Sequence, residues 1–373
     1  MPAPRWLRPT LCLLLIPLTL TAPSLAQGPA LPLQMPAPYT PDGALRDDYR
    51  CFLIDPQLES EATVKGYRIR PQAEGIVHHV ILFVISGNTI EAARAVDAAA
   101  PGPGWTCFGG PGVVAAEGFE AFQELARGFV RSLGVWTPGV ETATFPAGTG
   151  KPLAAGSQIV MQVHYNLQAG APAPDQSAVE LFLAEPDEAL ERLRLRALVA
   201  PVELRCPGPY PKDEKSPCHR DFAMSQLELP VLADAVHLEC GSRPSDFIER
   251  DVGFGDNQSF SCTTFMTSDG EALGVLTHMH LRGRTITVEL NPNTPRYTVL
   301  HHNPAWNFNA QEDTWFPEPV PFRFGDIVRL TCSYDNSGAV RGPDGQPLEP
   351  RYVTWGEGTT DEMCLAGIHH VRR

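Results

Sequence analysis

The sequence predicts an all-β fold of the sandwich or jelly-roll kind. Short apolar runs rich in β-branched and aromatic residues recur along the 373 residues, and 37 prolines and 32 glycines separate them. The clearest run, residues 284–290 (RTITVEL), alternates polar with apolar side chains, as a strand with one buried face does. We expect further strands in the apolar runs at residues 75–84, 157–165, 178–183, 193–204, 272–279 and 326–332.

The chain divides into two halves of similar length, each with one histidine cluster. Residues 185–192 are charged and have little strand character, so they mark the expected boundary between a first domain (27–187) and a second domain (188–373). Helical patterns are few; the best are residues 89–99 and 117–129, both expected at the periphery. Residues 205–218 are expected to form a disulfide-closed loop, and residues 339–352 a second exposed loop.

The first 26 residues have the pattern of a signal peptide. Arg5 and Arg8 precede an apolar stretch at residues 11–20, and Ser24-Leu25-Ala26 offers a small-residue cleavage site. The apolar stretch is too short to span a membrane comfortably, although an uncleaved anchor is the alternative. We therefore expect a secreted or periplasmic protein.

Cleavage would remove Cys12 and leave an even number of cysteines. In an exported protein this count indicates up to four disulfides, and none of the cysteines forms a CxxC pair that would suggest a redox dithiol or a zinc knuckle. The remaining eight are Cys51, Cys107, Cys206, Cys218, Cys240, Cys262, Cys332 and Cys364.

The net charge of −14 argues against nucleic acids and anionic membranes as partners. No apolar run after the leader is long enough to span a membrane. We expect a monomer whose partner is a small molecule or a peptide.

Six of the eleven histidines form adjacent pairs, and two more flank a single residue. His278 and His280 follow a predicted strand, where residues i and i+2 point to the same face, so both imidazoles could reach one metal ion or simply line a wet strand face. A cupin site would need a glutamate three or four residues after His280, where residues 281–284 read LRGR.

His78 and His79 are neighbours in a predicted strand and should point to opposite faces. They can share one ion only if the strand ends or twists there, or if they use different ring nitrogens. His164, in the run 159–165, could complete a three-histidine site or could simply pack in the core. Met363 alone would be ordinary core filling, but a thioether together with two imidazoles suits copper, especially Cu(I), and does not suit zinc or magnesium.

Four segments in this order resemble the copper type II, ascorbate-dependent monooxygenases, whose best-known members are peptidylglycine α-hydroxylating monooxygenase and dopamine β-monooxygenase. The segments are residues 78–83 (HHVILF), 162–165 (QVHY), 277–281 (THMHL) and 360–364 (TDEMC). The resemblance implies two antiparallel β-sandwich domains side by side, each carrying one copper ion.

The resemblance also implies the role of each ligand set. It places His78, His79 and His164 on an electron-supplying copper, and His278, His280 and Met363 on the catalytic, oxygen-binding copper. It suggests the disulfides Cys51–Cys107 and Cys332–Cys364, whereas only proximity in the sequence suggests Cys206–Cys218 and Cys240–Cys262.

The implied activity is that of an oxidoreductase that inserts one oxygen atom of O₂ into a C–H bond, with ascorbate or another one-electron donor as the reductant. An exported copper-binding or electron-transfer protein without turnover is the alternative, and Met363 argues against a zinc hydrolase. The arginine, asparagine and tyrosine that hold the peptide carboxylate in the amidating enzyme are replaced by Leu276, Leu365 and Gly367, which makes peptidylglycine a doubtful substrate.

The sequence does not decide the role of three further groups of charged or histidine residues. Arg282 and Arg284 could meet an anion or could lie on a solvated strand edge. His301-His302 precede a loop (303–308) that could face the second site or could be a turn packed by Trp306. His369-His370 are expected in a terminal strand, at the surface.

Overall fold

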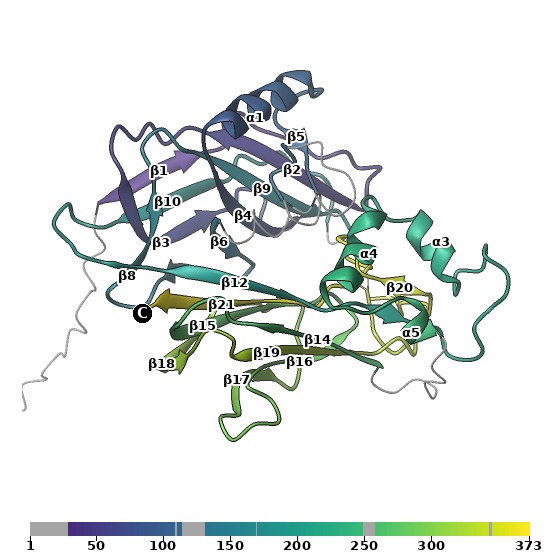
Figure 1. Ribbon diagram of the computed structural model, residues 1–373. Coiled ribbons are helices and arrows are strands. Elements are labelled where there is room, and N and C mark those ends of the chain that lie inside the picture. Colours follow the sequence, from purple (N-terminus) through teal and green to yellow (C-terminus); the bar gives the residue numbers. More distant parts are fainter. Residues whose placement is uncertain (1–28, 109, 114–130, 169, 249–257, 343–344) are drawn as a thin grey trace, which may run out of the picture.

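A computed structural model describes residues 29–108, 110–113, 131–168, 170–248, 258–342 and 345–373 (Figure 1). The predicted leader and the predicted helix at residues 117–129 lie outside these residues. The described chain is mostly β, as the sequence predicts, and each run expected to be a strand contains one. The other expected helix is α1 (Asn88–Ala99), at the outer edge of the molecule.

The N-terminal half forms two sheets. The six-stranded sheet has the order β1 (Ala30–Gln34), β10 (Ala178–Leu183), β3 (Ala62–Arg70), β8 (Thr149–Leu153) and β11 (Glu191–Arg192), with β7 (Ala143–Thr144) also paired to β3. The five-stranded sheet has the order β5 (Trp105–Thr106), β2 (Asp47–Ile54), β9 (Gln158–Asn166), β4 (Val77–Ile85) and β6 (Ser132–Trp136). Strand β9 is buried along its whole length because it lies at the centre of its sheet.

The C-terminal half forms two four-stranded antiparallel sheets and one short pair. The first sheet has the order β12 (Arg194–Val199), β21 (Leu365–Arg372), β15 (Gly270–His278) and β18 (Thr314–Phe322). The second has the order β14 (Gln258–Phe265), β19 (Ile327–Tyr334), β16 (Gly283–Leu290) and β17 (Thr298–Asn303), and β13 (Glu203–Leu204) pairs with β20 (Val353–Thr354). Three helices in the described part of the chain were not predicted from the sequence: α3 (Arg220–Ser225), α4 (Pro230–Glu239) and α5 (Ser245–Ile248).

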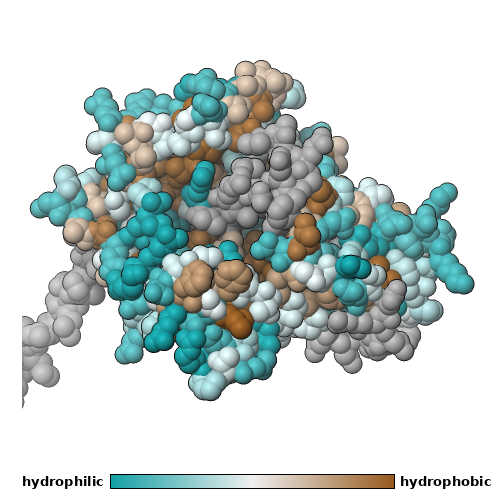
Figure 2. Space-filling model, in the orientation of Figure 1, coloured by the Kyte–Doolittle hydropathy of each residue, from teal (hydrophilic) through white to brown (hydrophobic). Residues whose placement is uncertain are grey.

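The buried side chains form two large clusters, one for each half. One cluster runs along the chain to Leu193 and the other begins at Leu198, close to the expected boundary. Leu273 and Val371 of the C-terminal half belong to the first cluster, so the two halves pack directly against each other. On the face shown in Figure 2, hydrophobic residues are visible in the upper part and at separate places lower down, and hydrophilic residues dominate the left and right margins.

Four disulfides join the cysteine pairs that the sequence analysis named: Cys51–Cys107, Cys206–Cys218, Cys240–Cys262 and Cys332–Cys364. The second closes the loop expected at residues 205–218. In the described part of the chain, no helix has the length and apolar character needed to cross a membrane.

The expectation that His369 and His370 lie at the surface is wrong. They belong to β21 as expected, but β21 is an inner strand between β12 and β15, and both side chains are buried. His369 contacts the Trp315 ring and pairs with Asp313, whereas His370 packs near Phe322. A terminal strand is therefore not an edge strand here.

Candidate metal centres

The first set of candidate ligands, His78, His79 and His164, lies on two neighbouring strands of the five-stranded sheet. His79 of β4 is the register partner of His164 of β9, and the register shifts between Val77 and His79, so that His78 is an extra, bulged residue. The bulge removes the strict alternation of side chains. As a result the Nδ1 atom of His79 lies 3.3 Å from Nδ1 of His78 and 3.4 Å from Nδ1 of His164.

These three side chains could hold a metal ion, because one ring nitrogen from each lies within 4.8 Å of the others. Burial is the main cause that lowers the pKa values of His78 and His79 well below the ordinary value, and the neighbouring histidines lower them further. Both rings are therefore neutral and keep a lone pair for a metal. The Nε2 atom of His78 is buried and has no hydrogen-bond partner in the described chain.

Asp47 orients the third ring of this set. Its Oδ1 atom accepts a hydrogen bond from Nε2 of His164 at 2.9 Å, which leaves Nδ1 of His164 facing the other two rings. Burial raises the pKa of Asp47, but the hydrogen bonds from His164 and Thr359 outweigh it, and the net shift is downward. The carboxylate is therefore ionised and acts as the acceptor.

The second set of candidate ligands, His278, His280 and Met363, lies in the C-terminal half. His278 ends β15, His280 follows two residues later, and the two ring centroids are 5.0 Å apart. Leu365, the register partner of His278, begins β21, so Met363 immediately precedes the strand beside β15. The disulfide of Cys364 and a 2.8 Å hydrogen bond from the Tyr334 hydroxyl to the Met363 carbonyl hold this segment.

Hydrogen bonds also orient both histidines of the second set. Nδ1 of His278 lies 2.6 Å from Oε1 of Gln311, and Nδ1 of His280 lies 3.2 Å from the carbonyl oxygen of Asp361. Both partners accept, so each Nδ1 carries the proton and each Nε2 keeps its lone pair. Burial lowers the pKa of His278 to about 4 and that of His280 well below its ordinary value.

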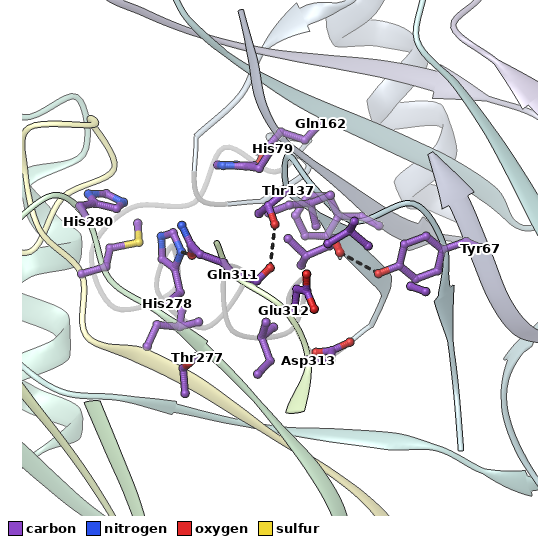
Figure 3. A pocket seen from close by; sticks show the side chains of 18 of the residues that line it. Tyr67, His79, Thr137, Gln162, Thr277, His278, His280, Gln311, Glu312 and Asp313 are labelled. Atoms are coloured by element: carbon purple, nitrogen blue, oxygen red, sulfur yellow. Dashed lines mark hydrogen bonds between the residues drawn. The ribbon is translucent and has the colours of Figure 1, made fainter. Parts of the chain in front are cut away.

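One cavity of about 290 Å³ between the halves is lined by His79 of the first set and by all three members of the second set. Figure 3 shows His278 and His280 on one side of it, and His79 with Gln162 across from them. The ring of Phe308 stacks on His78 at 4.2 Å and lies 6.0 Å from the His280 ring, so a single aromatic side chain separates the sets. Of the described residues, those that complete the cavity include the apolar Ile81, Phe83, Val135, Leu276, Trp315 and Leu365, and the polar Tyr67, Thr137, Thr142 and Thr144.

The loop after His302 reaches the second set, as one interpretation of the sequence expected, but His302 does not. His302 is exposed and pairs with Thr287, whereas Trp306 donates to the His280 carbonyl at 3.1 Å. The loop contributes Gln311, which sequence reasoning missed because it belongs to no motif. Thr137 comes directly after β6, and its hydroxyl donates to the Gln311 carbonyl at 2.7 Å (Figure 3).

The two arginines after the second set do not line the cavity. Arg282 is 2% exposed and donates to Asn336 and to the Glu349 carbonyl, so the interpretation as a solvated edge residue is wrong for it. The side chain of Arg284 is 53% exposed and pairs with Asp335. Both have protein partners.

Comparison with known proteins finds a match in the C-terminal half. Residues 259–373 match the family described as "Copper type II ascorbate-dependent monooxygenase, C-terminal domain". The chain is 31% identical over 91 residues to "DBH-like monooxygenase protein 2" of Mus musculus and 29% identical over 100 residues to "DBH-like monooxygenase protein 1" of Gallus gallus. These stretches are 24% and 26% of this chain, and only 13% and 14% of the relatives' own lengths.

Similarity to solved structures adds nothing to this. The structure of allantoicase covers 83% of this chain, and this chain covers 78% of it, at 12% identity and a TM-score of 0.17. A TM-score this low supports no shared fold.

Proposed function

The chain belongs, through its C-terminal domain, to the copper type II ascorbate-dependent monooxygenase family, and on that premise we propose that it is a copper-dependent monooxygenase. It would hydroxylate a C–H bond of a small-molecule or peptide substrate, with O₂ and a one-electron donor such as ascorbate. The observation that carries the proposal is the pair of histidine clusters beside one cavity, where Met363 lines the cavity together with His278 and His280.

The donor atoms fit copper. His78, His79 and His164 would hold one ion through three converging Nδ1 atoms, and His278, His280 and Met363 would hold the second through two Nε2 atoms and a sulfur. When bound, the copper ions would supply one electron each and activate O₂. Thioether ligation favours Cu(I), which suits the second set to the oxygen-binding role, and three imidazoles suit the first set to the relay role.

The remaining residues would position and enclose the reactants. Gln311 and the Asp361 carbonyl hold the second pair of imidazoles through Nδ1, which leaves Nε2 of each as the nitrogen that would bind the metal. The apolar side chains of the cavity would bind the carbon skeleton of the substrate and exclude water. Leu276 and Leu365 line this space, so a substrate carboxylate has no cation to meet at either position.

We also propose that each half, 27–187 and 188–373, is one β-sandwich domain with one copper site. The division is supported because each half contributes most of the residues of one large buried cluster and contains two sheets of four or more strands. The four disulfides support an exported protein that folds in an oxidising compartment.

Metal analysis together with oxygen uptake tests the function. We expect two copper ions per chain, and ascorbate-driven O₂ consumption in the presence of a substrate found by screening metabolites and peptides for gain of one oxygen atom. His278→Ala should reduce the copper content to one, and the exposed histidine variant His302→Ala should keep it at two. Two bound coppers with no oxygen uptake across the screen would favour the electron-transfer alternative, and a zinc-only preparation with full activity would exclude the redox function.

A further inference from the structure

We propose that Asp47 and Thr359 form a joint through which the loop that carries Met363 fixes the orientation of His164 in the other half of the molecule. The joint makes the geometry of the first copper site depend on the C-terminal half. The inference rests on the proposed function for the identity of the metal, but not for the joint itself.

One carboxylate oxygen makes both contacts of the joint. Oδ1 of Asp47 accepts from Nε2 of His164 at 2.9 Å and from the Thr359 hydroxyl at 2.5 Å. Thr359 is fully buried. Asp47 begins β2, and its register partner on β9 is Asn166, two residues after His164, so the strand pairing sets the distance from Asp47 to His164.

A second residue of β2 repeats the arrangement. Tyr49 is the register partner of His164 and points to the same face as Asp47, because the two are two residues apart. Its ring stacks on the His164 ring at 4.0 Å and 10°, and its hydroxyl donates to the Glu357 carbonyl at 2.5 Å. Two neighbouring side chains therefore connect the same imidazole to the same loop.

The other end of that loop is fixed to the second set. Glu362 accepts hydrogen bonds from the backbone N–H of His280, at 2.9 Å, and of Arg282, at 2.5 Å. Arg351 donates to the Asp361 carboxylate and to the Thr360 carbonyl. These contacts tie residues 360–362 to the rest of the C-terminal half, so the loop holds Thr359 in a fixed position beside Asp47.

The joint acts by position. A carboxylate that accepts from one ring nitrogen fixes the tautomer and the rotation of the imidazole and makes the other nitrogen a better metal ligand. The hydroxyl of Thr359 holds that carboxylate in place from the opposite half. Asp47 and Thr359 are therefore positioning residues for the first site, and neither is expected to touch the copper.

Two measurements test the joint. In metal-free full-length protein, nitrogen NMR of labelled histidine should show His164 as the Nε2–H tautomer, and Asp47→Asn or Thr359→Val should shift this population. In a His278→Ala background, which leaves only the first site, competition with a Cu(I) chelator should show about a 10–100-fold loss of affinity for Asp47→Asn and about a tenfold loss for Thr359→Val. Thr359→Ser, which keeps the hydroxyl, should restore the parent value.

Thr354→Val is the matched control. Thr354 is as buried as Thr359 and belongs to the same half, but its hydroxyl faces Glu203. If Thr359→Val has no more effect than Thr354→Val on the His164 tautomer population and on the Cu(I) affinity of the first site, the proposed joint is wrong. If the parent protein binds no copper at the first site, the proposed function fails, and the NMR measurement still decides the joint.

Discussion

The two candidate metal sites differ in what holds their ligands. The first set sits on adjacent inner strands, where strand register and one bulge bring three Nδ1 atoms together. In the second set only His278 belongs to a strand; His280 and Met363 lie just outside strand ends, and a glutamine and a main-chain carbonyl orient the two rings. The sheet therefore preorganises the first site, whereas contacts between loops assemble the second.

This difference has a functional meaning under the proposed mechanism. A site that relays electrons benefits from a geometry that changes little between oxidation states. A site that admits O₂ and substrate needs room and an open coordination position. Ligands that lie beside loops can provide such a position more easily than ligands fixed within a sheet. Apart from the contact of Thr359 with Asp47, we therefore expect changes in loops and disulfides to affect the second site more strongly than the first.

The largest expected effect comes from removing the thioether. Met363→Ile keeps the volume of the buried side chain but removes the sulfur, so Cu(I) affinity at the second site should fall on the order of 10³-fold, more than loss of an outer-shell partner costs. The first site should bind as before. Competition with a Cu(I) chelator measures the affinity of each site, and metal analysis gives the number of copper ions per chain. An unchanged second-site affinity would show that Met363 is core filling and not a ligand.

The second-largest effect is expected from removing one disulfide at a time, which should affect the two sites differently. Cys332→Ala with Cys364→Ala should lower the free energy of unfolding by about 3 kcal/mol and also weaken the second site, because Cys364 follows Met363 directly. Cys51→Ala with Cys107→Ala should cost similar stability but leave the affinity of the first site unchanged, since strand pairing holds its ligands. Urea unfolding and Cu(I) titration check both. Equal effects on the two sites would contradict the comparison.

The sequence predicted the strands, and the grouping of the histidines into two clusters, better than the contacts around them. Alternation within a strand and His-x-His spacing are local, and both are visible in residues 272–290. The bulge that lets His78 and His79 converge depends on the register with β9. Two adjacent histidines in the sequence therefore could not decide whether both bind the same metal ion. The helix α4 was missed although Pro230 at its first position is a helix-start signal.

The orienting residues were beyond sequence reasoning for a different reason. Asp47, Phe308 and Gln311 each act on a ring that is distant in sequence, and all three contact residues of both halves of the chain. No periodicity encodes a contact made by packing two halves together. The buried position of His369 was misjudged for the same reason, since strand order, and not position in the chain, decides which strand is at the edge.

A smaller effect should follow from removing the hydrogen bond that orients the His278 ring. Gln311→Leu keeps the approximate size of the side chain but removes the acceptor for the His278 ring, so affinity at the second site should fall about tenfold. Gln158→Leu is the control, because Gln158 is an equally buried glutamine that bonds Asp55, outside both ligand sets. Cu(I) competition at both sites provides the measurement, and a loss at the first site as large as at the second would contradict the assignment of Gln311 to His278.

The smallest expected effect tests whether a buried charge between the halves alters stability without altering either site. Lys151 of β8 is 7% exposed, its ammonium donates to the Ser132 and Leu133 carbonyls at 3.0 Å each, and burial lowers its pKa to about 8. Below pH 8 both the folded and the unfolded chain hold this proton, so stability does not change through this group. Above pH 8 the folded protein releases the proton first, so the free energy of unfolding should rise by about 1 kcal/mol per pH unit until the unfolded lysine also titrates.

Urea unfolding between pH 7 and 9.5 should show this rise in the parent protein and in Lys65→Met, which removes a lysine that pairs with Glu188 nearer the surface. The same rise should be absent from Lys151→Met, so the difference between the two variants isolates the buried group from all other titrations. Copper affinity at both sites should match the parent in each variant at pH 7, because Lys151 contacts no ligand. A Lys151→Met protein with the full pH dependence would place the titration elsewhere, and a change in copper affinity would show that the interface controls the sites through charge as well as through position.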